Sequence, residues 1–97
     1  MSKFKIPERF NASSAPDVEK KLLATIQREK PGKMICDFSE TVYMSSAGLR
    51  VMLVVSKKMK LIDGEAIFCG VQPEVFSIFK MAGFTGVLNI QQEDVEE

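Results

Sequence analysis

Short apolar runs alternate along this chain with longer stretches whose apolar positions recur every three or four residues. Runs of the first kind are typical of strands, and stretches of the second kind are typical of amphipathic helices. Prolines and glycines separate many of them. Strands are therefore expected at 4–6, 33–38, 66–69 and 87–90. Three helices are expected: one with Pro16 in its first turn and Pro31 after its end, a second at 46–62, and a third from Pro73 to Gly83. The third helix is expected to face partly inward with Val75, Phe76, Phe79 and Met81. Such alternation predicts an α/β fold with a small mixed sheet of about four strands and helices packed on it.

The stretch 46–62 allows two interpretations. Leu49, Leu53 and Leu61 recur at helical spacing, whereas the three valines within 50–55 favour a strand. About 17 residues separate Ser46 from the turn that follows, which is long for a strand and ordinary for a helix. A helix is therefore predicted, with Ser45 or Ser46 as its N-cap.

Length and composition indicate one folded domain. The 97 residues leave no room for an independent second domain, and 45% of them are hydrophobic while 27% are charged. We expect a single domain over 1–97, with its core at about 4–90 and an acidic tail at 91–97. No apolar run approaches membrane-spanning length, and the first residues show no signal-peptide pattern, so a cytoplasmic protein is expected.

The net charge of zero hides an uneven distribution. The tail holds four of the 13 acidic residues, so residues 1–92 carry nine acidic against 13 basic residues. Lys57, Lys58 and Lys60 cluster late in the second expected helix, where cations favour the negative end of the helix dipole. A solvated helix end explains them better than a nucleic-acid surface, because no aromatic residues are interleaved with them.

Several enzymatic chemistries are excluded by residue type. The chain has no histidine, so it cannot build a Ser-His-Asp or Cys-His arrangement or a histidine-containing metal site. Its six glycines form no phosphate-binding motif. Cys36 and Cys69 are expected to be buried thiols rather than a disulfide or redox pair. We therefore expect no enzymatic activity, no cofactor and no metal.

Residues 43–50, YMSSAGLR, place two hydroxyls and a glycine where a strand gives way to a helix. Serine is among the commonest N-cap residues, and spacing alone favours a purely structural role. The unpaired N–H groups and positive dipole of a helix start would also tolerate a phosphate on Ser46. The spacing leaves both a cap and a switch open.

A wider pattern favours the switch. DFS at 37–39, YMSSAGL at 43–49, DGEAIFCG at 63–70 and PEVFSIFKMAGF at 73–84 together resemble the STAS domain of bacterial anti-sigma factor antagonists, in order from about Phe4 to Ile90. Members carry an acidic or polar residue, the phosphorylated serine, a small residue and then Gly-Leu, which maps the phosphoacceptor to Ser46. Ser45 stands where many members have Asp and is the weaker candidate acceptor. Asn11 also stands where many have Asp.

The resemblance implies a protein that acts by binding. Such an antagonist binds an anti-sigma factor that is also a GHKL-type serine kinase, and so releases a sigma factor. Phosphorylation by that kinase inactivates it, and a PP2C-type phosphatase restores it. The partner-binding residues implied around the acceptor are Asn11, Met44, Ser45, Ser46, Ala47 and Arg50.

Other functions remain open at this point. STAS domains also resemble interaction subunits of secretion and stress-signalling regulators and the accessory subunit of lipid-transport ABC systems. A nucleotide-binding module is disfavoured because the chain lacks a phosphate loop. Neither nucleic-acid binding nor membrane insertion is implied.

Overall fold

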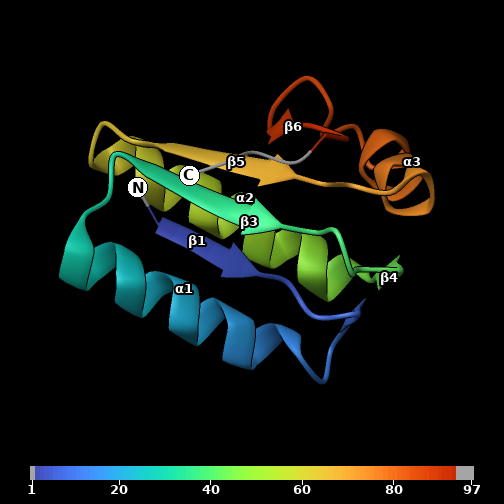
Figure 1. Ribbon diagram of the computed structural model, residues 1–97, viewed down its shortest axis with the longest axis horizontal. Coiled ribbons are helices and arrows are strands. Elements are labelled where there is room, and N and C mark those ends of the chain that lie inside the picture. The colour runs from blue at the N-terminus through green and yellow to red at the C-terminus, as the bar shows by residue number, and fades with distance from the viewer. Residues whose placement is uncertain (1, 94–97) are drawn as a thin grey trace.

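A computed structural model describes residues 2–93 as an α/β fold (Figure 1). The main sheet contains β1 (Ser2–Lys5), β3 (Lys33–Asp37), β5 (Glu65–Cys69) and β6 (Asn89–Ile90). A second, two-stranded sheet pairs β2 (Arg9–Phe10) with β4 (Tyr43–Met44). The helices are α1 (Ala15–Glu29), α2 (Ser46–Leu61) and α3 (Pro73–Met81).

The main sheet has the strand order β1-β3-β5-β6, and every strand pair within residues 2–93 is parallel. The predicted α/β fold is confirmed, but the described sheet is parallel rather than mixed. The cause lies in the chain order, because a helix follows each of β1, β3 and β5 before the next strand of the main sheet. Such a crossover returns the chain in the same direction. Consequently β1, β3 and β5 end at the same edge of the sheet, and β2, β4 and the start of α2 lie close to that edge (Figure 1).

Helices α1 and α2 cover one face of the main sheet and run beside each other (Figure 1). The buried side chains of α1 and α2 pack against the buried side chains of β3 and β5, and α3 covers the core near the ends of the strands. Phe38 contacts three other rings, with centroid separations of 6.4 Å to Phe10, 6.2 Å to Phe68 and 5.8 Å to Phe79. Apolar burial of this kind is the main stabilising contribution to the fold. The core is lined chiefly by Ile6, Phe10, Val18, Leu22, Ile26, Met34, Cys36, Phe38, Met44, Val51, Met52, Val55, Met59, Phe68, Val75 and Phe79.

The two cysteines lie on opposite faces of the sheet. Cys36 belongs to the core beneath the helices, whereas Cys69 packs with Ile35 and Ile67 on the other face. Both cysteines are buried and form no disulfide within the described residues, as predicted. Burial raises the pKa of the Cys36 thiol, with a further contribution from the neighbouring Cys69. The thiol is therefore neutral and unreactive at physiological pH.

Two apolar residues at the ends of helices are exposed. Leu61 is 77% exposed and Met81 is 89% exposed. Each lies two residues beyond the last buried position of its helix, Met59 in α2 and Phe79 in α3. Two residues correspond to about 200° of rotation, which turns the side chain away from the core. The expectation that Met81 faces partly inward was therefore wrong.

The last strand is shorter than expected. It covers Asn89–Ile90, because Val87 belongs to the preceding turn and is 57% exposed. Of the expected tail, residues 91–93 are described, and Glu93 accepts a hydrogen bond from the backbone N–H of Gly70 at 2.9 Å. Asp94, Glu96 and Glu97 lie outside the described residues. Within 2–93, no helix is both long and apolar enough to cross a membrane.

Candidate functional site

The small β2–β4 sheet positions the start of α2. Sequence patterns did not predict it, because each strand has only two residues and so shows no periodicity. Phe10 pairs with Met44, and the backbone N–H of Ser45 donates to the Phe10 carbonyl at 2.9 Å. The chain segment before α2 is therefore held by backbone hydrogen bonds up to the N-cap residue.

A buried threonine fixes the turn that leads into β4. Thr41 is fully buried, and its hydroxyl lies 2.9 Å from the Pro7 carbonyl and 3.3 Å from the Ile6 carbonyl. Next to it, Glu40 forms an ion pair with Lys5 at 2.9 Å. The hydrogen bond from Lys5 to Glu40 raises the pKa of the Lys5 ammonium. Both side chains are well exposed, however, so water screens their attraction. The turn is therefore held mainly by Thr41.

Gly48 allows the first turn of α2 to pack directly on this small sheet. A Cβ atom at Gly48 would lie 2.8 Å from Cδ2 of Phe10, 2.9 Å from Cγ of Met44 and 2.9 Å from the Phe10 carbonyl oxygen. Real Cβ contacts are essentially never this short. Only glycine fits here without a shift of its neighbours, because the first turn of α2 lies so close to the backbone of Phe10.

Ser45 and Ser46 have different environments. Ser45 is the N-cap residue, with φ −92° and ψ 176°, yet its side chain makes no capping hydrogen bond. Its Oγ is buried and has no hydrogen-bond partner within the described residues. Ser46, the first residue of α2, is exposed. The predicted position of the cap is confirmed, but the hydroxyl open to solvent belongs to Ser46.

The electrostatics at this helix start favour an anion. No acidic side chain lies in the first turn of α2, and the helix dipole places partial positive charge there. Arg50 follows Ser46 by one turn and is exposed. Within the described part of the chain, no group of three or more acidic, cysteine or histidine residues could hold a metal ion.

The structure brings most of the predicted partner-binding residues together around Ser46. Asn11 directly follows the end of β2 at Phe10, whose carbonyl accepts the hydrogen bond from Ser45. Its Oδ1 accepts from the backbone N–H groups of Ser13 at 3.0 Å and Ser14 at 3.2 Å, which orders the turn before α1. Ala47 is half-buried. Met44 differs from the prediction, since it is 1% exposed and packs in the core, where the alternation along β4 turns it inward.

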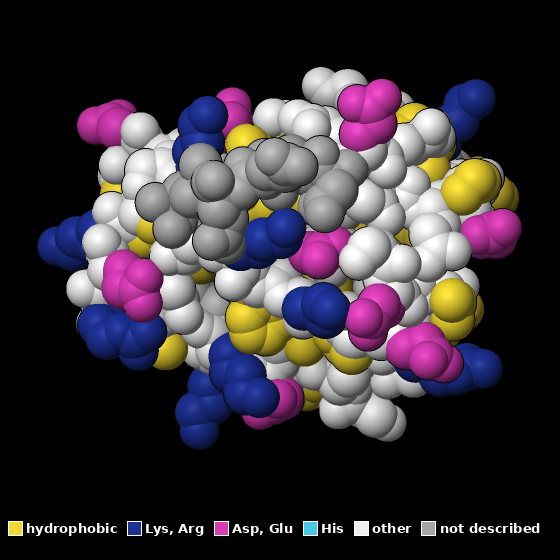
Figure 2. Space-filling model, in the orientation of Figure 1, with side chains coloured by type: hydrophobic (Ala, Val, Ile, Leu, Met, Phe, Trp, Pro, Cys, Tyr) yellow, Lys and Arg dark blue, Asp and Glu magenta, His cyan; other side chains and the backbone are white. Residues whose placement is uncertain are grey.

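Exposed apolar side chains that the sequence did not indicate lie next to these partner-binding residues. Val42 is 49% exposed and Tyr43 is 43% exposed, immediately before the helix start. Figure 2 shows apolar side chains at the end of the molecule where β4 and α3 lie. Tyr43 points outward and Met44 inward, as neighbouring residues of a strand do, but β4 is too short for the sequence to show this alternation.

Comparison with known proteins identifies the class. The family model for the STAS domain matches residues 2–96. The chain therefore belongs to the STAS domain family.

Individual relatives are more specific. A curated relative from Bordetella bronchiseptica strain RB50, BtrV, is 31% identical over 80 residues, which cover 82% of this chain and 68% of BtrV. By its name, BtrV is a proposed anti-sigma factor antagonist.

Solved structures share the fold at low sequence identity. The anti-sigma factor antagonist SpoIIAA in its unphosphorylated form is 16% identical with a TM-score of 0.80, covering 92% of this chain and 78% of SpoIIAA. The Bacillus protein SpoIIAA is also similar in its phosphorylated form, with 14% identity, a TM-score of 0.71, and coverage of 92% and 81%. A sulfate transporter family protein from Wolinella succinogenes is 17% identical with a TM-score of 0.82, covering 95% of this chain and 76% of that protein. Because these identities are low, the likeness establishes the fold alone.

Proposed function

We propose that this protein is an anti-sigma factor antagonist that binds an anti-sigma factor with serine kinase activity and is inactivated by phosphorylation of Ser46. Membership of the STAS family and the similarity to BtrV support the class of function. The observation that carries the site is the exposed hydroxyl of Ser46 at the first position of α2. The protein would act by binding, in the cytoplasm, with no cofactor.

The local structure supports Ser46 rather than Ser45 as the acceptor. A kinase must bring the hydroxyl oxygen in line with the γ-phosphate of ATP, which requires an accessible hydroxyl. Ser46 meets this requirement, whereas the Ser45 Oγ is buried. The backbone contacts of Gly48 with β2 and the hydrogen bond of Ser45 to Phe10 hold the acceptor in a fixed position.

The physics of the switch follows from charge. A phosphate on Ser46 adds about −1.5 to −2 charges at neutral pH. The helix dipole would stabilise that charge in the free protein. In a complex, the same charge would be buried against a surface that accommodates a small hydroxyl, at a cost of several kcal/mol unless a cation faces it. Phosphorylation is therefore expected to release the kinase, and a PP2C-type phosphatase would restore binding.

The partner surface would extend from the acceptor over the residues around it. It would include the half-buried Asn11, Ser45 and Ala47, the exposed Arg50, and Tyr43, whose aromatic side chain is 43% exposed. Exposed tyrosines are enriched at protein interfaces. Met44 would contribute by supporting Gly48 from below rather than by contact with the partner.

Phosphosite mapping tests this proposal. The purified chain is incubated with ATP and a GHKL-type anti-sigma kinase of the same organism, and peptides are analysed by mass spectrometry. One phosphate on Ser46 is expected in the parent and in Ser45→Ala, and none in Ser46→Ala. Phosphate on Ser45 of Ser46→Ala, at the rate seen in the parent, would contradict the assignment.

An adaptor function is the second candidate, because a sulfate transporter family protein shares the fold. Such an adaptor could serve a secretion, stress-signalling or lipid-transport system, and the lipid-transport accessory role needs no kinase partner. An unmodified chain that still binds its partner stably in the presence of ATP would favour this alternative.

A further inference from the structure

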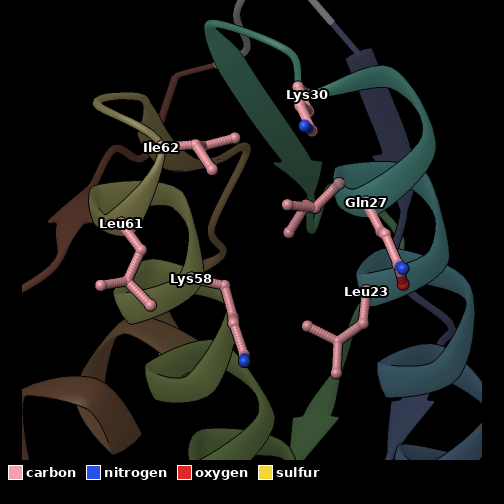
Figure 3. A pocket seen from close by; sticks show the side chains of 7 residues that line it. Leu23, Gln27, Lys30, Lys58, Leu61 and Ile62 are labelled. Carbon is pink, nitrogen blue, oxygen red and sulfur yellow. The ribbon is translucent and has the colours of Figure 1, made fainter.

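An apolar groove lies between the C-terminal halves of α1 and α2 (Figure 3). It has a volume of about 370 Å³, and its apolar lining comes from Leu23 and Ile26 of α1 and from Leu61 and Ile62 at the end of α2. Ile26 is 5% exposed and belongs to the core, whereas Leu23 and Ile62 are half-buried. The groove is therefore continuous with the hydrophobic core at its base and open to solvent at its rim.

Leu61 enlarges the apolar surface beyond the groove itself. It is 77% exposed, and in Figure 3 Ile62 points from α2 toward α1 while Leu61 lies along the outer side of α2. A single exposed leucine is common on a protein surface. Here the exposed leucine adjoins a groove that is itself apolar, which is typical of an interaction surface.

The charged groups at the rim have one sign. Lys30 and Lys58 line the groove together with the neutral Gln27, and no carboxylate contributes to the lining within the described residues. Neither ammonium has an ion-pair partner in the part of the chain that the structure describes. The nearby Glu29 is already engaged by Arg28 at 2.8 Å and by the Ser2 hydroxyl at 2.8 Å. The helix dipole stabilises lysines near a helix C-terminus, which alone could explain Lys30 and Lys58. The apolar groove between these two lysines is the feature that indicates a ligand.

Charge complementarity selects the occupant. A second copy docked groove to groove would bring further lysines and no carboxylate of the described lining into the interface, which disfavours self-association. An amphipathic helix with leucine-like side chains on one face and carboxylates beside them matches both the groove and its rim. Such a helix would also cover Leu61, which lines the groove and is 77% exposed.

We propose that the groove between α1 and α2 binds an acidic amphipathic helix of a partner protein. Apolar side chains of that helix occupy the space between Leu23 and Ile62, and its carboxylates contact Lys30 and Lys58. The groove lies at the opposite end of α2 from Ser46, about 22 Å away along the helix. Binding there is therefore independent of the Ser46 phosphate, and this surface does not depend on the function proposed above.

Fluorescence anisotropy with a defined peptide tests the proposal. The probe is a labelled helical peptide of about 16 residues with leucines on one face and glutamates elsewhere, and the control peptide has the same composition with the leucines dispersed. At near-physiological salt we expect saturable binding of the probe and at least about tenfold weaker binding of the control peptide. Amide shifts in heteronuclear spectra should map to Leu23, Ile26, Lys58 and Ile62. Equal binding of both peptides, or no binding of the probe, would overturn the proposal.

Matched variants separate the groove from general surface effects. Leu61→Glu and Lys58→Glu are each expected to weaken the probe at least about tenfold. Met81→Glu and Lys57→Glu, at equally exposed positions that do not line the groove, should bind like the parent, and so should Ser46→Asp. Circular dichroism checks that each variant is folded. Unchanged binding of Leu61→Glu would contradict the proposal.

Other occupants give different outcomes in the same measurements. If dodecanoate shifts the groove amides and displaces the probe at lower concentration than a competing unlabelled peptide, the occupant is a lipid anion and the proposal fails. If the parent sediments as a dimer and Leu61→Glu as a monomer, the groove is a self-association surface and the proposal fails as well.

Discussion

At the scale of single residues, the neighbouring serines of the helix start have separate roles. Ser46 is exposed to solvent, whereas the Ser45 hydroxyl is buried and has no hydrogen-bond partner among the described residues. A serine N-cap normally contributes about 1 kcal/mol through its side-chain hydrogen bond. That contribution is absent here, because the structure shows no such bond. Ser45 is therefore a cap by backbone conformation only.

Replacing Ser45 with alanine should not lower the free energy of unfolding, because no capping bond is lost and a buried hydroxyl, unpaired in the described part of the chain, is removed. Urea denaturation measures this. Thr41→Val is the control, since it removes a buried hydroxyl with two carbonyl partners and should cost about 1–2 kcal/mol. A loss of 1 kcal/mol or more in Ser45→Ala would show that the hydroxyl does form a capping bond in solution.

Cys36 gives the fold a pH dependence on the alkaline side. Burial raises the pKa of its thiol above the value of about 8.5 in an unfolded chain. Below pH 8.5 or so, both states keep the thiol neutral and its contribution is constant. Above that pH, only the unfolded chain loses the proton, so this group lowers the free energy of unfolding by up to about 1.4 kcal/mol per pH unit.

The corresponding prediction compares slopes. Between about pH 8.5 and 10.5, the free energy of unfolding of Cys36→Ala should fall less steeply with pH than that of the parent. Denaturant titrations at several pH values measure both curves, and the variant's lower stability at neutral pH does not affect the comparison. Parallel curves would show that Cys36 does not titrate differently in the two states.

At the scale of elements, α2 connects two ends of the molecule. Its first turn packs on the β2–β4 sheet through Gly48, and its last turn borders the groove beside α1. The contact at Gly48 is close because the Phe10 carbonyl lies under the helix. The position of Ser46 therefore depends on a glycine two residues later.

Gly48→Ala tests this contact. Alanine would favour an isolated helix by about 1 kcal/mol. In this protein its Cβ would collide with Phe10 and Met44, so a net loss of about 1–2 kcal/mol is expected, with slower phosphorylation of Ser46. Gly86→Ala is the control, because its Cβ would meet nothing within 4 Å. Higher stability of Gly48→Ala than of the parent would contradict the packing described here.

Sequence patterns predicted the long elements well, for physical reasons that particular residues show. The helix at 46–62 was favoured by its length and its serine, and the structure has α2 at Ser46–Leu61. Strands of two residues have no periodicity, so β2 and β4 could not be found, and with them the burial of Met44 was missed. Met81 was expected to face partly inward, because hydrophobicity alone does not give the rotation of a helix. The outward position of Tyr43 depends on the unpredicted strand β4.

At the scale of the whole molecule, the parallel topology places the proposed partner surface at one end and the groove at the other. The carboxyl ends of β1, β3 and β5 face the region of β4 and α3, while α1 and α2 end at the opposite side (Figure 1). A phosphate at Ser46 would change the charge of the first surface only. The two proposals together predict that phosphorylation would release one partner and leave the other bound.

The affinity of the anti-sigma kinase for two forms of this chain tests the Ser46 switch most directly. Isothermal titration calorimetry would compare the unmodified chain with the chain phosphorylated stoichiometrically on Ser46, both at the same salt concentration. The switch predicts that phosphorylation weakens binding at least about tenfold, which corresponds to about 1.4 kcal/mol or more. Equal affinities for the two forms would contradict it.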